Sequence, residues 1–359
     1  MRILYKEDVL DIIYAATLLG TGGGGTITLA LRMLDELEKT HKIQVKMIET
    51  DEMEQGKYAC MVAGMGSPVS LEAKGFGKDA VYAFKGYQEE LRKSGKDLAY
   101  TYSGEYGGSS TFVSIYVSIL CDVPFVNLDG NGRAVPEMGT TLLPLYRYPT
   151  SPFVLANENG DVVVCNTKDP YNTKAAEKFA RVICVAEGMK IGFACWAVDR
   201  DNAKKYMIPG GMDKLLLTGR ILRNLKTEDD PVKSLSGALQ CRELFRGTVS
   251  KVDLVSRDGF DFGITYVETG YGTASISFKN ENILAKDERG DVILTVPESI
   301  CLLDVDNFMP LTNAAVKEGM RIIVIALPAA ELWWHTPDGY DCWREILKGI
   351  GYNGEAVCY

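Results

Sequence analysis

A run of glycines between two predicted helices is the feature that most constrains this chain. The run is Gly20-Thr21-Gly22-Gly23-Gly24-Gly25, and apolar side chains recur at helical spacing in residues 7–19 before it and 30–37 after it. Glycine lets a backbone approach a ligand closely, and the free amides of the following helix attract a negative or electron-rich group. We therefore predict that Gly22, Gly23, Gly24 and Gly25 bind a substrate. A tight corner between two packed helices is the alternative.

The same run matches the residue pattern of a dinucleotide-binding motif, but the predicted secondary structure before it does not fit that motif. Gly20-x-Gly22-x-x-Gly25 fits the glycine fingerprint, and Glu49 or Asp51 lies where an acidic ribose ligand is expected. That fingerprint needs a strand directly before the glycines, whereas the charges and spacing of residues 6–19 favour a helix. A phosphate-binding P-loop is excluded because no Gly-Lys-Ser/Thr follows. We expect no nucleotide, and a nicotinamide-dependent oxidoreductase is the least favoured function.

Strand and helix patterns alternate along the first half of the chain, which predicts an α/β domain. Repeated strand–loop–helix units favour a mostly parallel sheet, whose ligands bind at the C-terminal ends of the strands. The expected strands are 43–48, 59–65 (running into Gly66-Ser67-Pro68), 98–102, 123–128 and 162–165, and the expected helices are 80–93, 109–120 and 173–187.

The second half reads differently, with short alternating runs separated by Gly, Asp and Asn turns. These runs include residues 264–268, 274–278, 292–296, 300–305 and 321–327, and they predict a β-rich module. A strand at 191–198 and a helix at 212–226 precede them. A chain of 359 residues exceeds the roughly 250–300 residues of a single core. We therefore expect an α/β domain with glycine-rich loops at 1–170 and a β-rich C-terminal domain at 171–359.

A second glycine turn carries a carboxylate. Glu105 stands in Ser103-Gly104-Glu105-Tyr106-Gly107-Gly108, just before the helix expected at 109–120, where the helix dipole favours a negative charge. We predict that Gly107 and Gly108 bind substrate and that Glu105 is catalytic. A purely structural helix cap is the alternative for Glu105.

The densest polar cluster follows the strand expected at 123–128. In Asp129-Gly130-Asn131-Gly132-Arg133-Ala134-Val135-Pro136-Glu137, Asp129 or Glu137 could activate a water molecule as general base. Arg133 could clamp a substrate carboxylate with two hydrogen bonds. The alternative is an internal Arg133–Glu137 ion pair that steadies the loop.

Candidates for a metal site are few. The chain has two histidines, His41 and His335, and His335 with Asp338 and Asp341 forms the weak candidate set for a divalent metal. Nine cysteines occur without a CxxC pair and read as reduced, packed thiols. A nucleophilic pair of Cys60 or Cys195 with His335 is a further alternative, but nothing in the sequence places either cysteine beside that histidine. The cofactor stays unknown, with a divalent metal as the possibility.

Charge and hydropathy limit the partners. A net charge of −9 without a basic patch argues against nucleic acid. Acidic residues follow the N-terminus too soon for a signal peptide, and no stretch of about 18 apolar residues occurs. We expect a cytoplasmic protein with no membrane partner.

The order of these motifs resembles the S-methyl-thiohydantoin desulfurase family. Gly-Thr-Gly-Gly-Gly-Gly at 20–25, Glu-x-Gly-Gly at 105–108 and Asp-Gly-x-Gly-Arg-Ala-x-Pro-Glu at 129–137 carry the resemblance, with Leu-Phe-Arg-Gly-Thr-Val at 244–249 and Phe-Lys-Asn-Glu-Asn at 278–282. The resemblance implies removal of the sulfur substituent from a five-membered thiohydantoin ring, which leaves a hydantoin. It also implies a setting similar to hydantoinase and oxoprolinase systems. The family usually has an acidic residue where this chain has Asn127.

From these observations we expect a hydrolase acting on a small cyclic amide or thiohydantoin-type ring. Water would attack the ring carbon between two nitrogens, and glycine-loop amides would stabilise the developing charge. A non-catalytic partner subunit of a hydantoinase-like enzyme is the alternative. Partners are then the small cyclic substrate and either copies of this chain or a hydantoinase-like protein.

Overall fold

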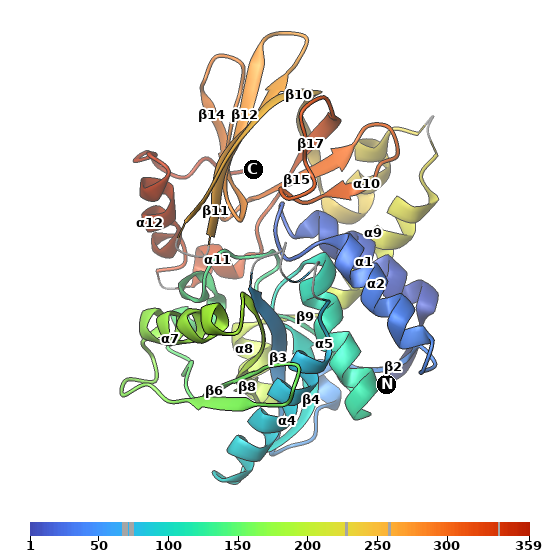
Figure 1. The fold of residues 1–359 in the computed structure, drawn as a ribbon. Coiled ribbons are helices and arrows are strands. Elements are labelled where there is room, and N and C mark those ends of the chain that lie inside the picture. The colour runs from blue at the N-terminus through green and yellow to red at the C-terminus, as the bar shows by residue number, and fades with distance from the viewer. Residues whose placement is uncertain (67–70, 72–74, 227–228, 258–259, 337) are drawn as a thin grey trace.

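A computed structural model describes residues 1–66, 71, 75–226, 229–257, 260–336 and 338–359, and two β-sheets dominate it (Figure 1). Ser67 and Pro68, where we expected the strand beginning near residue 59 to end, lie outside the described residues. So does Pro337, between two of the candidate metal ligands.

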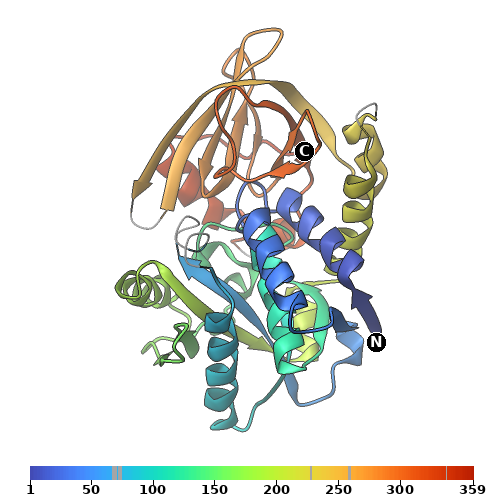
Figure 2. The ribbon, with the colours of Figure 1, turned by 45° about the vertical axis from the view of Figure 1, so that its right-hand side comes forward.

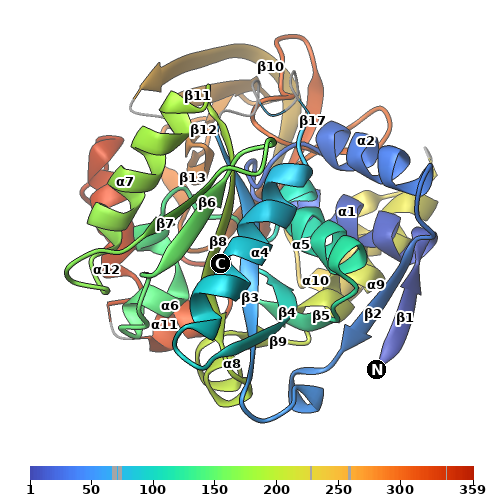
Figure 3. The ribbon, with the colours of Figure 1, turned by 60° about the horizontal axis from the view of Figure 1, so that its bottom comes forward.

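The first sheet is mixed, and its centre is parallel. In the described residues it has nine strands in the order β1-β2-β5-β4-β3-β8-β6-β7, with β9 paired to β5. Strands β2, β5, β4 and β3 run parallel, and antiparallel strands complete the sheet on both sides (Figure 3). The predicted α/β fold with a mostly parallel sheet is thus confirmed. The bounds are β1 Arg2–Tyr5, β2 Gln44–Ile48, β3 Lys57–Gly66, β4 Asp97–Ser103, β5 Phe125–Asp129, β6 Phe153–Ala156, β7 Val162–Cys165, β8 Lys190–Val198 and β9 Ile208–Pro209.

Both faces of the first sheet are covered, as the alternation of its side chains requires. On β6, Val154 and Ala156 join the core beneath α4 (Lys78–Arg92) and α5 (Gly108–Cys121), whereas Phe153 and Leu155 join the core beneath α7 (Thr173–Ala186). Successive residues of a strand point to opposite faces, so a strand buried on both sides is apolar throughout. The remaining elements of this half are α1 Lys6–Leu19, α2 Ile27–Glu38, η1 Thr50–Glu52, η2 Met138–Thr140, α6 Leu142–Leu145, α8 Arg200–Tyr206, α9 Gly211–Asn224 and α10 Pro231–Leu239.

The second sheet is antiparallel throughout, which confirms the β-rich module. In the described residues it has eight strands in the order β14-β13-β12-β11-β10-β17-β15-β16. Two short helices, α11 Leu332–His335 and α12 Asp341–Gly349, follow it. The strands are β10 Arg242–Arg257, β11 Phe260–Glu268, β12 Thr273–Lys279, β13 Glu281–Lys286, β14 Val292–Thr295, β15 Ser299–Asp304, β16 Pro310–Leu311 and β17 Arg321–Leu327.

The first sheet extends past the expected boundary at residue 170. Strands β8 and β9 pair with β3 and β5, so residues on both sides of that boundary build one sheet. The second sheet begins only at β10. Figure 2 shows it above the first sheet, with the N-terminal helices reaching its lower side.

Candidate functional site

The first glycine turn lies at the junction between the two sheets. It joins α1 to α2, and its carbonyls accept hydrogen bonds from the second half of the chain. The N–H of Asn282 donates to the Thr21 carbonyl at 2.7 Å, and the N–H of Asn313 donates to the Gly22 carbonyl at 2.8 Å. The helix predicted before the turn is confirmed as the 14-residue α1. A dinucleotide fingerprint needs a strand directly before its glycines, and this turn follows a helix instead.

Four of the six predicted binding glycines, Gly24, Gly25, Gly107 and Gly108, pack where the two helix-opening turns meet. A Cβ on Gly24, whose φ is +70°, would lie 2.5 Å from the Cα of Gly107, and a Cβ on Gly108 would lie 2.5 Å from Oγ1 of Thr17. A Cβ on Gly25 would overlap the Ser109 side chain. For these glycines the geometry matches the alternative of a tight helix corner, because only hydrogen fits where the two turns meet.

Gly22 and Gly23 face side chains of the second half of the chain instead, two on β13 and one just after β16. A Cβ on Gly22 would lie 2.6 Å from Nδ2 of Asn313 and 2.8 Å from Nδ2 of Asn282, and one on Gly23 would lie 2.5 Å from the carboxyl carbon of Glu281. Within the described residues, Oε2 of Glu281 and Oδ1 of both asparagines are buried without a hydrogen-bond partner. The turn is therefore surrounded by unused acceptors, which suit a ligand rich in N–H donors.

Glu105 lies in the loop between β4 and α5, shortly before the helix, as predicted. Its Oε1 accepts a hydrogen bond from Oγ of Ser110, and its Oε2 accepts one from the N–H of Val135, each at 3.0 Å. Loss of water around the carboxyl group raises its pKa, and the neighbouring Asp129 raises it further, whereas Arg133 lowers it. The residue as a whole is half-buried, but its carboxyl group is enclosed by protein and held by these two hydrogen bonds.

Asp129 is fully buried at the end of β5. Its Oδ2 accepts hydrogen bonds from the N–H groups of Asn131 at 2.9 Å and Gly132 at 2.5 Å, which shape the following turn. Its Oδ1 has no partner in the described part of the chain. Burial raises the pKa of Asp129 to about 7, although the two amides oppose the shift.

Glu281, at the start of β13, is the functional candidate that sequence reasoning missed. It is 4% exposed, and burial followed by the charge of Glu105 raises its pKa. The available signal was the polar run Asn280-Glu281-Asn282 at the start of a strand that continues as Ile283-Leu284-Ala285. Glu105 and Glu281 repel each other across the junction, and Arg133 attracts both.

Arg133 does not have the predicted geometry of a substrate clamp. Its guanidinium makes five hydrogen bonds within the chain, all 2.8–3.1 Å, to the carbonyls of Ala134, Pro297, Glu298 and Asn282 and to Oγ1 of Thr21. The ring of Trp343 lies 4.8 Å below it. All five N–H donors of arginine are thereby used, so Arg133 joins the two halves of the chain rather than a substrate carboxylate.

Glu137 and the weak metal candidates lie in other settings than expected. Oε2 of Glu137 pairs with Nζ of Lys279 on β12 at 2.8 Å, so the ion pair that we considered with Arg133 is replaced by one across the domain junction. Asp341 pairs with Arg344 at 3.0 Å, and His335 and Asp338 are exposed. No group of three His, Cys, Asp or Glu side chains among the described residues is arranged to hold a metal ion.

The cysteines considered as nucleophiles are buried. Loss of water raises the pKa of both Cys60 and Cys195 well above the ordinary value, which disfavours the thiolate that would attack. Asn127, where the family usually has an acid, donates from Nδ2 to Glu49 at 2.9 Å and Asp213 at 2.8 Å. Its Oδ1 accepts the Met212 N–H at 2.9 Å, so it binds two acids and caps the start of α9.

These features define a two-domain protein whose candidate site gathers buried carboxyl groups between an α/β domain and an antiparallel β domain. The model of the S-Me-THD-like N-terminal domain matches residues 7–167, and that of the S-Me-THD-like C-terminal domain matches residues 171–345. The chain belongs to this S-Me-THD-like family, as its motifs predicted.

A crystal structure of a protein from Chromobacterium violaceum shares the fold. Its TM-score is 0.86 at 24% sequence identity, and the match covers 99% of this chain and 100% of the other. No curated protein matches this chain. Among the described residues, no helix is long and apolar enough to cross a membrane.

Proposed function

We propose that the chain hydrolyses a small cyclic amide of the thiohydantoin type at the junction between its two domains. The observation that carries the proposal is the meeting of Glu105, Asp129 and Glu281, three carboxyl groups whose pKa values are all raised by burial. Carboxyl groups that titrate near neutral pH can accept and donate protons during one turnover. The family's thiohydantoin-related character supports the substrate class.

The reaction balances with two carboxyl groups in complementary roles. Ionised Glu105 takes a proton from water, whose oxygen bonds to the ring carbon between the two nitrogens, while protonated Glu281 gives its proton to a ring nitrogen. The carbon–sulfur bond then breaks, the thiol leaves with the proton held by Glu105, and the new hydroxyl returns a proton to Glu281. The products are a thiol and a hydantoin whose new carbonyl oxygen comes from water.

Residues of β13 and of the segment after β16 supply the contacts that would orient the ring. The unused oxygens of Glu281, Asn282 and Asn313 accept hydrogen bonds, and ring N–H groups of a hydantoin or thiohydantoin donate them. Leaving such buried acceptors without a partner is costly, so a ring that supplies donors gains binding energy there.

A thiol-release assay tests the proposal. The purified protein would be incubated with S-methyl-thiohydantoins, and the released thiol would be titrated with a chromogenic disulfide. The mass of the hydantoin product would be measured by mass spectrometry after reaction in ¹⁸O-water. We expect one ¹⁸O atom in the hydantoin and a loss in kcat of about 100-fold or more for Glu105→Gln, the range for a lost general base.

Asp79→Asn is the matched control. Asp79 is also a buried acid with a raised pKa and an oxygen that lacks a hydrogen bond, but it lies on α4 beside Lys190. Its variant should keep wild-type turnover. Absence of thiol release from a panel of thiohydantoins, or full turnover by Glu105→Gln, would refute the proposal.

A further inference from the structure

One edge of the first sheet exposes an apolar surface. Strand β7 is the last strand on that side, and helix α7 lies beside it. Six apolar side chains of these two elements, which we call the β7–α7 patch, are 38–63% exposed: Val162, Val163, Val164, Phe179, Val182 and Val185. Val163 lies on the same face of the sheet as α7, whereas Val162 and Val164 lie on the opposite face, so this sheet edge is apolar on both faces. Scattered exposed apolar residues are normal, but a sheet edge that is apolar on both faces beside an apolar helix stripe marks an interaction surface.

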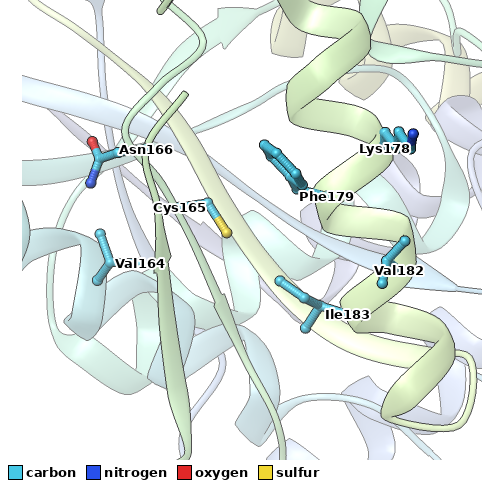
Figure 4. A pocket seen from close by; sticks show the side chains of 7 residues that line it. All are labelled: Val164, Cys165, Asn166, Lys178, Phe179, Val182 and Ile183. Atoms are coloured by element: carbon cyan, nitrogen blue, oxygen red, sulfur yellow. The ribbon is translucent and has the colours of Figure 1, made fainter. Parts of the chain in front are cut away.

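The patch contains a groove between the strand and the helix. Figure 4 shows Phe179 and Ile183 on the helix pointing toward Cys165 across it, with Val182 on the outer side of the helix and Val164 on the far side of the strand. The groove measures about 450 Å³, and its lining is mostly apolar. Water in such a groove is displaced favourably by another apolar surface.

The other sheet edges in the described residues are protected, and β7 is not. At the opposite edge, β1 carries Arg2, which pairs with Asp213. In the second sheet, β14 is covered by the C-terminal tail, because Thr295 exchanges hydrogen bonds with Val357, and β16 has only two residues. Strand β7 reads Val-Val-Val-Cys, without the charge or proline that usually blocks edge-to-edge pairing.

Charges beside β7 favour a second copy of this strand, in antiparallel orientation, as its partner. Exposed Asp161 precedes the strand and exposed Lys168 follows it. Antiparallel pairing about a two-fold axis places Asp161 of each copy near Lys168 of the other, whereas parallel pairing would place like charges together.

We infer that the chain forms a two-fold dimer in which β7 pairs with β7 of a second copy and the first sheets join into one. The exposed valines then form cross-strand pairs, and the two α7 helices pack over the joint through Phe179, Val182 and Val185. The candidate catalytic site lies at the junction between the two domains and includes no residue of β7 or α7. This inference therefore stands apart from the proposed function.

Sedimentation velocity over a concentration series tests the dimer. The wild type should sediment as a dimer that dissociates on dilution. Val182→Asp, which places a charge in the joint from both copies, should raise the dissociation constant by about tenfold or more. Val255→Asp on β10 is the matched control, because Val255 is 62% exposed against 63% for Val182, and its variant should dimerise like the wild type.

A charge exchange tests the orientation. Asp161→Lys and Lys168→Asp should each weaken the dimer, and the double variant should restore it, because opposite charges again meet across the axis. Circular dichroism should show unchanged folding in every variant, since all these side chains are exposed. A wild type that stays monomeric at all concentrations, or a Val182→Asp variant that dimerises as well as Val255→Asp, would overturn the inference.

Discussion

Burial sets the protonation of the carboxyl groups at the domain junction more than any charged neighbour does. For Glu105, Asp129 and Glu281 alike, loss of water is the largest cause of the raised pKa. The structure retains acids in places where their ionised forms are unfavourable, which is common where proton transfer is the function. Such acids are expected to reduce stability as they ionise.

The pH dependence of stability should reveal Asp129. Its pKa rises from 3.8 in a free side chain to about 7 in the folded chain. When the pKa of a carboxyl group is higher in the folded chain than in the unfolded chain, the folded state holds the proton more tightly. The resulting stabilisation is fully present at pH values below the pKa of the unfolded chain, and it is lost as pH rises through the pKa of the folded chain. The free energy of unfolding should therefore fall between about pH 4 and pH 7, by up to about 4 kcal/mol for this group.

Asp129→Asn removes this ionisation while it keeps an oxygen for the amides of Asn131 and Gly132. Thermal unfolding followed at several pH values should show the variant gaining stability relative to wild type as pH rises from 5 to 8. Asp201→Asn is the control, because the Asp201 side chain is 89% exposed. The difference in unfolding temperature between this variant and wild type should be the same at every pH. A difference between Asp129→Asn and wild type that does not change with pH would contradict the assignment.

At the scale of elements, the two glycine turns matter because α2 and α5 start against each other. The Ser110 N–H donates to the Gly24 carbonyl at 3.1 Å, so the first turn of α5 is tied to the preceding glycine run. The dense glycines thus bring two helix N-termini together and place Gly22 and Gly23 beside the second sheet. Neighbouring glycines of one run thus pack against two different partners, the α5 turn and side chains of the second half of the chain.

Gly24→Ala should destabilise the fold strongly. Its Cβ would meet Gly107, and a positive φ adds about 1–2 kcal/mol of strain for a residue other than glycine. We expect a total loss of about 2–4 kcal/mol in urea unfolding. Gly237→Ala in α10 is the control, because nothing lies within 4 Å of the new Cβ there, and alanine should stabilise that helix by up to about 1 kcal/mol. Equal stability of Gly24→Ala and wild type would show that the turns can separate.

Elements with a strong apolar period were predictable, and those without one were not. Helices α4 and α7 followed from the 3.6-residue spacing of their buried residues, to within a residue or two at their ends. Strand β10 was missed although it has 16 residues, because most of its side chains are exposed or half-buried and leave little alternation. The four-residue β1 is too short for a pattern.

The candidate site was only half predictable for a related reason. Glu105 and Asp129 stand at strand ends in one sheet, where local sequence predicts convergence. Glu281 reaches them from the other sheet, and no local pattern relates residues so far apart in the chain. Arg133 has the composition of a ligand clamp, but its five partners come mainly from the second domain, so its structural role depends on how the domains pack.

At the scale of the whole molecule, Arg133 couples the two domains. It belongs to the loop after β5, and four of its five hydrogen bonds reach beyond that loop, to the α1–α2 turn and to residues 282, 297 and 298. Burial lowers its pKa, but nearby acids, Glu281 first, oppose that shift and favour the charge. One buried side chain therefore holds the domain junction together and moderates the acids of the candidate site.

Arg133→Lys should uncouple the domains. Lysine keeps the charge but offers three donors on one nitrogen, so several buried acceptors lose their partners, at a cost of about 3–5 kcal/mol. In differential scanning calorimetry we expect the single wild-type transition to move down and to split, because the domains no longer unfold together. Arg223→Lys is the control. Arg223 binds Glu7 and Asp11 and so joins α9 to α1, two helices that pack against each other and not through the second sheet. That variant should lower the transition while keeping it single. A single, unshifted transition for Arg133→Lys would mean that other contacts, such as the Glu137–Lys279 pair, hold the junction.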